Sequence, residues 1–97
     1  MITTKQRSKL RAMAHTFAPV AIIGKEGITD SVLKSIDDVL EARELIKIRL
    51  LNNCSLSTRE ASDIICDELS SEGIQCIGSI VVIYRKSKRN DVEHIEI

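Results

Sequence analysis

Aromatic side chains are almost absent from this chain of 97 residues. It contains one Phe, one Tyr and no Trp. Proteins that read single-stranded nucleic acids usually stack bases on several aromatic side chains. The sequence therefore excludes a base-stacking platform of that kind.

Cysteines are few and widely spaced, and long apolar runs are lacking. Cys54, Cys66 and Cys76 form no Cys-x-x-Cys pair, which argues against a zinc site and thioredoxin-like chemistry. No stretch approaches the roughly 20 apolar residues that span a bilayer, and no N-terminal segment resembles a signal peptide. We therefore expect a reduced, cytoplasmic protein without a membrane partner, with Cys66 and Cys76 in the core and Cys54 in a loop.

Signatures of catalysis and of cofactor binding are also missing. His15 and His94 stand apart from any Ser or Cys nucleophile with an orienting acid. Adjacent acids such as Asp37 and Asp38 point about 100° apart on a helix, so they do not converge on one substrate. The Gly-x-x-Gly at residues 24–27 has neither the Gly-Lys-Ser/Thr ending of a P-loop nor the third glycine of a dinucleotide fingerprint. We expect no enzymatic activity, cofactor, metal or small-molecule substrate.

The formal net charge is zero, but charges of each sign are concentrated in separate segments. Residues 1–25 hold five basic residues and no acid, and residues 85–89 hold four basic residues. Residues 60–72 hold five acids and no base. Each block could be an ordinary solvated face of a helix or strand. If the basic blocks meet in space, they form a basic surface beside an acidic one.

Apolar periodicity and capping signals predict seven elements. Residues 3–6 (TTKQ) and 57–60 (STRE) are capping boxes that begin helices, and Thr29 or Asp30 can cap another helix. Gly73 is expected to end the third helix, and residues 78–79 (GS) suit a two-residue hairpin. The predicted elements are a helix to about residue 15, a buried strand at 20–23, a helix after residue 29, a strand at 45–50, a helix from residue 58, and strands at 74–77 and 80–84.

The order of these elements predicts one α/β domain over residues 1–97, α-β-α-β-α-β-β, with a four-stranded mixed sheet. Right-handed crossovers would place the second and third helices on one face of the sheet. The first helix could pack on the other face or at an edge. The ordered core is expected at about residues 3–86, followed by a frayed polar tail. In the third helix, the residues expected to be buried are Ala61, Ile64, Ile65 and Leu69.

The junction at residues 22–28 (IIGKEGI) is the strongest candidate for a binding site. Gly24 and Gly27 connect a predicted strand to a helix N-terminus, and glycines let backbone approach a ligand closely. Free amide groups of the loop and the first helical turn would attract an anion, with Lys25 adding a charge. Glu26 opposes this and would face solvent. An ordinary tight turn is the simpler alternative for a motif this short.

Other basic residues strengthen the case for a phosphate-binding loop. Lys47 and Arg49 share the polar side of a predicted strand, and the first helix carries Lys5, Lys9 and Arg11. A broad basic surface without stacking aromatics suits structured RNA, where phosphate and 2′-OH contacts dominate. The sequence thus favours a non-catalytic RNA-binding protein.

Four segments in order along the chain resemble the bacterial YhbY proteins, the stand-alone form of the CRM (chloroplast RNA splicing and ribosome maturation) domain. They are residues 10–15 (LRAMAH), 19–28 (PVAIIGKEGI), 44–48 (ELIKI) and 75–85 (QCIGSIVVIYR). The resemblance implies a fold similar to the C-terminal domain of bacterial initiation factor three. It also implies a Gly-x-x-Gly loop that binds RNA, and association with ribosomal RNA in precursors of the large ribosomal subunit.

The site residues implied by the resemblance fall into two groups. Gly24, Lys25 and Gly27 match the loop of the family, and Glu26 departs from it by adding a negative charge. The generally basic positions of the family are matched by Lys5, Lys9, Arg11, Lys47, Arg49 and Arg85.

A different class of function remains open from the sequence. The third helix exposes Asp63, Asp67 and Glu68, which could form the docking face of a protein–protein adaptor. The two functions are compatible, because a basic face could hold RNA while an acidic face contacts a basic ribosomal protein.

Overall fold

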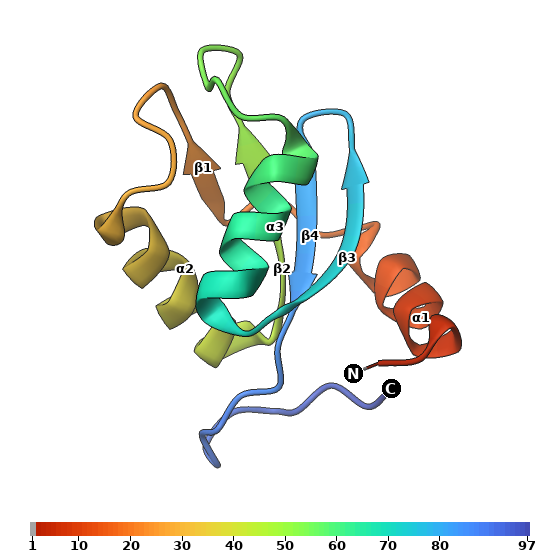
Figure 1. The fold of residues 1–97 in the computed structure, drawn as a ribbon. Helices are drawn as coiled ribbons and strands as arrows, with labels where there is room; N and C mark the ends of the chain where they lie inside the picture. Colours follow the sequence, from red (N-terminus) through yellow and green to blue (C-terminus); the bar gives the residue numbers. More distant parts are fainter. Residues whose placement is uncertain (1) are drawn as a thin grey trace.

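The computed structural model describes residues 2–97 and has the predicted order of elements (Figure 1). An α/β fold with three helices and a four-stranded mixed sheet is therefore confirmed. The elements are α1 (Thr4–Ala14), β1 (Ala21–Ile23), α2 (Asp30–Arg43), β2 (Leu45–Leu50), α3 (Thr58–Leu69), β3 (Glu72–Ile77) and β4 (Ile80–Tyr84).

The strands lie in the order β1-β2-β4-β3, so β1 and β3 are the two edges of the sheet. β1 runs parallel to β2, whereas β4 is antiparallel to both β2 and β3. In Figure 1, α2 and α3 lie in front of the sheet and α1 lies beyond the β3 edge. The first helix therefore packs on the opposite side from the other two.

Local capping signals determine where the helices begin. Thr3 and Gln6 form the capping box of α1, and Ser57 and Glu60 form that of α3. Thr29 caps α2 by accepting a hydrogen bond from the Val32 amide. These starts were predicted correctly because a capping box is read from four consecutive residues.

The end of α3 was predicted wrongly. The helix stops at Ser70, which adopts a left-handed conformation with φ of 53°. Gly73 belongs to β3, where a Cβ atom would lie 3.2 Å from the Ser62 hydroxyl. The glycine thus permits a close approach of β3 to α3 and does not act as a helix cap.

Two apolar clusters lie on the two faces of the sheet. Between the sheet and α2 and α3, the buried side chains are Ile23, Ile36, Leu40, Ile46, Ile48, Leu50, Ala61, Ile65, Val81 and Ile83. On the other face, α1 covers a smaller cluster of Leu10, Ala14, Leu45, Ile74, Val82 and Tyr84. Because α1 covers only part of that face, the remainder stays open.

Three burial predictions fail. β1 is an edge strand and not a buried one, since Ile22 is 59% exposed. Ile64 is 39% exposed, and its place on the inner side of α3 is taken by Ser62. Cys76 lies on the exposed β3 edge, whereas Cys66 and Cys54 are half-buried.

The C-terminal segment after β4 packs on the domain, so the expected frayed tail is wrong. The buried carboxylate of Glu44 accepts hydrogen bonds from the amides of Ser87 and Ile95 and from the His94 ring. Ile95 and Ile97 then pack against the cluster under α1. Most residues of this segment are polar, so nothing in the sequence indicated that Ile95 and Ile97 would pack against the domain.

Candidate nucleic-acid interface

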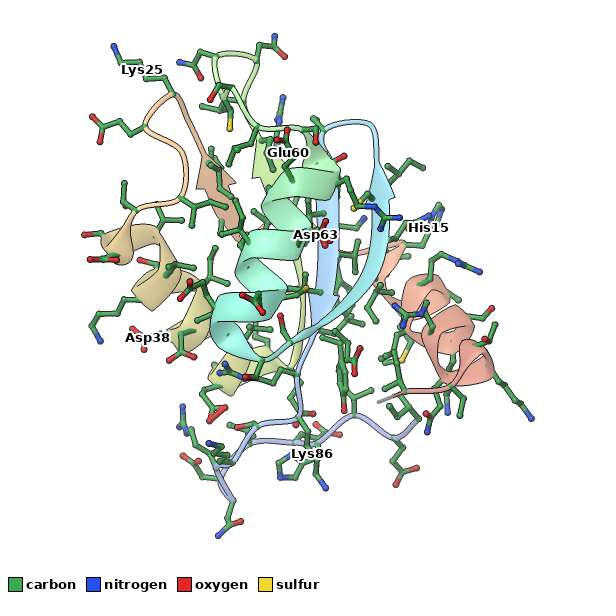
Figure 2. All side chains as sticks on the ribbon, viewed as in Figure 1. His15, Lys25, Asp38, Glu60, Asp63 and Lys86 are labelled. Carbon is green, nitrogen blue, oxygen red and sulfur yellow. The ribbon has the colours of Figure 1, made fainter. Side chains whose placement is uncertain are left out.

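The Gly-x-x-Gly loop is a tight turn that projects from the β1 edge of the sheet. The Gly27 amide donates to the Gly24 carbonyl at 3.0 Å, and Gly27 has φ of 72°, which favours glycine. Figure 2 shows the Lys25 side chain pointing outward from the loop, away from the sheet. The turn therefore presents its two charged residues to solvent.

The backbone of the turn retains groups that could bind an anion. Within residues 2–97, the amides of Lys25 and Glu26 have no hydrogen-bond acceptor, while the Gly27 amide is already used. At the start of α2, Thr29 occupies the Val32 amide. One donor of the helix start is therefore already used, and the amides at the tip of the turn remain available to an anion.

Arg49 lies in the middle of a row of side chains that crosses the open part of the sheet. Strand register places Ile22 beside Arg49, Arg49 beside Ile80, and Ile80 beside Ile77. The two end members, Ile22 and Ile77, are 59% and 58% exposed. This open row (Ile22, Arg49, Ile80 and Ile77) offers one cation flanked by aliphatic side chains on the face that α1 leaves uncovered.

Lys47 is closer to the linker between α1 and β1. Its Nζ donates to the His15 carbonyl at 3.3 Å, and its backbone carbonyl accepts from the Val20 amide. The side chain is half-buried. Lys47 therefore helps to hold the linker against the sheet and presents only part of its charge to a ligand.

The basic residues of α1 lie toward the opposite edge of the sheet from the glycine loop. Lys5, Lys9 and Arg11 are exposed, and α1 packs over β3, β2 and β4. No ion pair involves these three side chains, Lys25, Lys47 or Arg49 within residues 2–97. The cations therefore do not form one compact patch; they extend from the loop at β1 across the sheet to α1 at β3.

Arg85 has a structural role, which argues against its assignment to the RNA site. Its side chain is 17% exposed, and its guanidinium donates to Asp37 at 2.7 Å and to the Leu69 carbonyl at 2.9 Å. Glu41 lies 3.5 Å from the same group. Arg85 thus ties the end of β4 to α2 and α3, and its charge is already neutralised.

The acidic side of the molecule is the outer surface of α3. Asp63, Asp67 and Glu68 surround Ile64 there, as expected from the helical spacing of these acids. Among residues 2–97, no group of three or more potential ligands is arranged to hold a metal ion. None of the helices in that range is long and apolar enough to cross a membrane.

Sequence reasoning missed two basic residues at the β3 edge. Arg7 and Arg59 line the same groove as Arg11, although they lie on different helices. The spacing of Arg7 and Arg11, one helical turn apart, was a usable signal. The position of Arg59 beside them could not be read from the sequence, because it depends on the packing of α3 against β3.

Comparisons with known proteins agree with the fold. The family model described as the CRS1 / YhbY (CRM) domain matches residues 2–85. A Bacillus subtilis protein named "Probable RNA-binding protein YqeI" is 39% identical over 90 residues, which cover 93% of this chain and 94% of the relative. A Haemophilus influenzae protein named "RNA-binding protein" is 32% identical over 92 residues, covering 95% and 93% of the two chains.

A solved structure is also similar. The solution structure of the hypothetical protein SAV1595 from Staphylococcus aureus has a TM-score of 0.70 and 43% sequence identity. The match covers 98% of this chain and 100% of that one.

Proposed function

Because the chain belongs to the CRS1/YhbY (CRM) domain family, we propose that it is a non-catalytic, cytoplasmic protein that binds structured RNA. Relatives from B. subtilis and H. influenzae carry RNA-binding names and align along nearly the whole chain. The scarcity of aromatic side chains favours contacts to phosphate and 2′-OH groups over base stacking.

The observation that carries this proposal is the exposed turn at residues 24–27. It combines two amides that have no acceptor among residues 2–97, an outward Lys25 and a glycine backbone that permits close approach. Arg49, on the open row of the sheet, and the basic side chains of α1, toward the opposite edge, would add longer-range attraction. Glu26 lowers the affinity of the turn for phosphate without altering its shape.

We further propose that the RNA is ribosomal RNA in precursors of the large ribosomal subunit, with a role in ribosome assembly. The support is the family resemblance together with the chemistry of the surface. Dispersed cations separated by aliphatic side chains suit a folded RNA whose phosphates lie on several sides of the protein.

An isosteric pair of variants at Gly27 tests the loop. Asn and Asp both tolerate positive φ and have the same shape, so Gly27→Asn and Gly27→Asp differ in charge alone. If phosphate approaches the turn, Gly27→Asp binds a ribosomal RNA hairpin at least about tenfold more weakly than Gly27→Asn, and the difference shrinks as salt is raised. Equal affinities for two variants with native circular dichroism would remove the loop from the mechanism.

Sedimentation tests the role in assembly. In a sucrose gradient of cell lysate at low salt, the protein is expected to migrate with precursors of the large subunit and to shift to the top of the gradient at high salt. If the protein were found only in the free fraction at low salt, an assembly role would be contradicted. RNA binding itself would still be decided by the affinity for the hairpin.

The exposure of Ile64 among acids favours a second, compatible function as an adaptor for a basic ribosomal protein. Ile64 is 39% exposed among three acids, which would attract a basic partner by charge. Ile64→Ser combined with Asp67→Lys is expected to release a protein partner that survives nuclease treatment, with RNA affinity not reduced. If the double variant kept that partner, α3 would be an ordinary solvated helix without a docking role.

A further inference from the structure

A groove of about 830 Å³ runs along the open edge of β3, between α1 and α3. Figure 1 shows β3 at the rim of the sheet, between α3 and α1 in this view. We call it the arginine groove; its lining residues are Arg7, Arg11, Arg59, Ser62, Asp63, Cys66, Gly73, Ile74, Gln75 and Cys76.

Positive charges outnumber negative charges among the residues that line the arginine groove. Arg7 and Arg11 come from successive turns of α1, and Arg59 comes from the first turn of α3. Asp63 is the only acid among the lining residues, and within residues 2–97 no ion pair neutralises any of the three arginines. By contrast, Arg85 is paired with acids inside the fold. The groove therefore holds cations that lack an internal counter-charge.

The chemistry of the lining suits an anionic polymer better than an enclosed small molecule. Ile74 is the only lining residue with a large aliphatic side chain, whereas small-molecule pockets are mostly apolar. Guanidinium groups match phosphate oxygens with two parallel hydrogen bonds.

Residues of β3 form one side of the groove. Arg7 donates to the Gly73 carbonyl, and the strand is irregular between Gly73 and Gln75. A Cβ atom at Gly73 would lie 3.2 Å from the Ser62 hydroxyl, so a side chain there would require Ser62 to shift slightly. Arg11 and Arg59, whose side chains are exposed, line the groove beside this strand.

We propose that the arginine groove is a second binding site for the phosphate backbone of RNA, at the opposite edge of the sheet from the glycine loop. This inference rests on the proposed function, because both sites would hold one RNA. Three strand spacings, about 14 Å, separate β1 from β3, and the open row with Arg49 lies between the two edges. Two such contacts fix the orientation of a folded RNA, which one loop could not do.

Neutral variants of the exposed arginines test the groove. Arg11→Gln and Arg59→Gln are each expected to weaken binding of a ribosomal RNA hairpin about three- to fivefold, and to reduce the slope of log affinity against log salt by about 1. The matched control is Lys34→Gln, which removes one charge from the outer surface of α2, where Lys34 pairs only with Asp38. It should bind RNA nearly as tightly as the wild-type chain.

Removing a negative charge from the groove is expected to strengthen RNA binding and provides a second test. Asp63 lines the groove, whereas Asp67, one turn further along α3, does not. Asp63→Asn is expected to strengthen RNA binding about two- to fivefold, and Asp67→Asn is expected to change it by less than about twofold. Equal gains for both variants would show an effect of total charge only, and would overturn the assignment of the groove.

The outcomes separate this site from the glycine loop. If Gly27→Asp weakens binding while Arg11→Gln and Arg59→Gln bind as the wild type does, the groove proposal is overturned and the proposed function stands. If no chain binds RNA, both are overturned. Unchanged RNA affinity together with binding of an acidic peptide that adds a strand to β3 would make the groove a protein-docking edge instead, which also overturns the proposal.

Discussion

The carboxylate of Glu44 lies 2.7 Å from Nδ1 of His94, a residue 50 positions later in the chain. Glu44 is 0% exposed and ends α2 with φ of 68°, an unusual conformation for a residue with a side chain. The same carboxylate accepts the amides of Ser87 and Ile95. One buried acid thus fastens the C-terminal segment to the rest of the domain.

The protonation of Glu44 is expected to control the stability of this attachment. Burial alone would raise its pKa, but the hydrogen bonds from His94, Ile95 and Ser87 together lower the pKa below the usual 4.5. A lowered folded-state pKa means that the stabilisation is present above the unfolded-state pKa and is lost as pH falls through the folded-state value. Attachment of the C-terminal segment should therefore weaken under acid conditions.

Glu44→Gln is predicted to lower the free energy of unfolding by about 1–3 kcal/mol at neutral pH, because an amide cannot accept all three hydrogen bonds as a carboxylate does. Urea denaturation at about pH 7 and about pH 3 should show the difference from wild type shrinking in acid. Glu93→Gln, an exposed change of the same charge beside His94, is the control. A pH-independent difference would contradict the role of the ionised carboxylate.

The two glycines of the loop are predicted to respond differently to alanine. At Gly24 a Cβ atom would make an ordinary contact with Leu51 at 3.7 Å, so Gly24→Ala should change the free energy of unfolding by less than about 1 kcal/mol. At Gly27 there is space, but φ of 72° strains any residue with a Cβ, and Gly27→Ala should cost about 1–2 kcal/mol.

Urea denaturation of the two alanine variants measures this asymmetry. Gly27→Asn supplies the comparison, because Asn tolerates positive φ and should recover part of the loss. If Gly24→Ala proved the more destabilising change, the turn geometry at residues 24–27 would be wrong.

The predictable parts of this fold were those determined by near neighbours in sequence. Both capping boxes and the alternation of Ile46, Lys47 and Ile48 were read correctly because each signal lies within a few residues. The hairpin at Gly78 was found for the same reason, and its φ of 57° fits the glycine there.

The parts that could not be predicted depend on contacts between distant segments. Nothing in the sequence marks Glu44 as an anchor, because only the folded chain brings the Ser87 amide to it. Arg85 looked like a free base because Asp37, 48 residues away, gives no sign of pairing in the sequence. Likewise the arginine groove requires α1 and α3 to meet at β3, which element order alone left open.

Arg85→Gln is predicted to be a stability variant and not an RNA-binding variant. Removing the guanidinium leaves Asp37 and the Leu69 carbonyl without their donor, which should cost about 1–3 kcal/mol in unfolding free energy. Lys86→Gln, at the next and exposed position, should cost less than about 0.5 kcal/mol. Hairpin affinity measured well below the unfolding temperature should match the wild type, and a large loss of affinity there would return Arg85 to the RNA site.

Glu26→Gln is predicted to strengthen RNA binding about two- to fivefold, because the glutamate is the one acid of the turn and repels phosphate within a Debye length of about 8 Å. The gain should be largest at low salt. Glu93→Gln makes the same change of charge in the C-terminal segment, which lies at the opposite end of the molecule from the loop (Figure 1). Fluorescence anisotropy of a labelled ribosomal RNA hairpin should therefore separate the two variants. Equal affinities would mean that RNA responds to total charge and does not approach the turn.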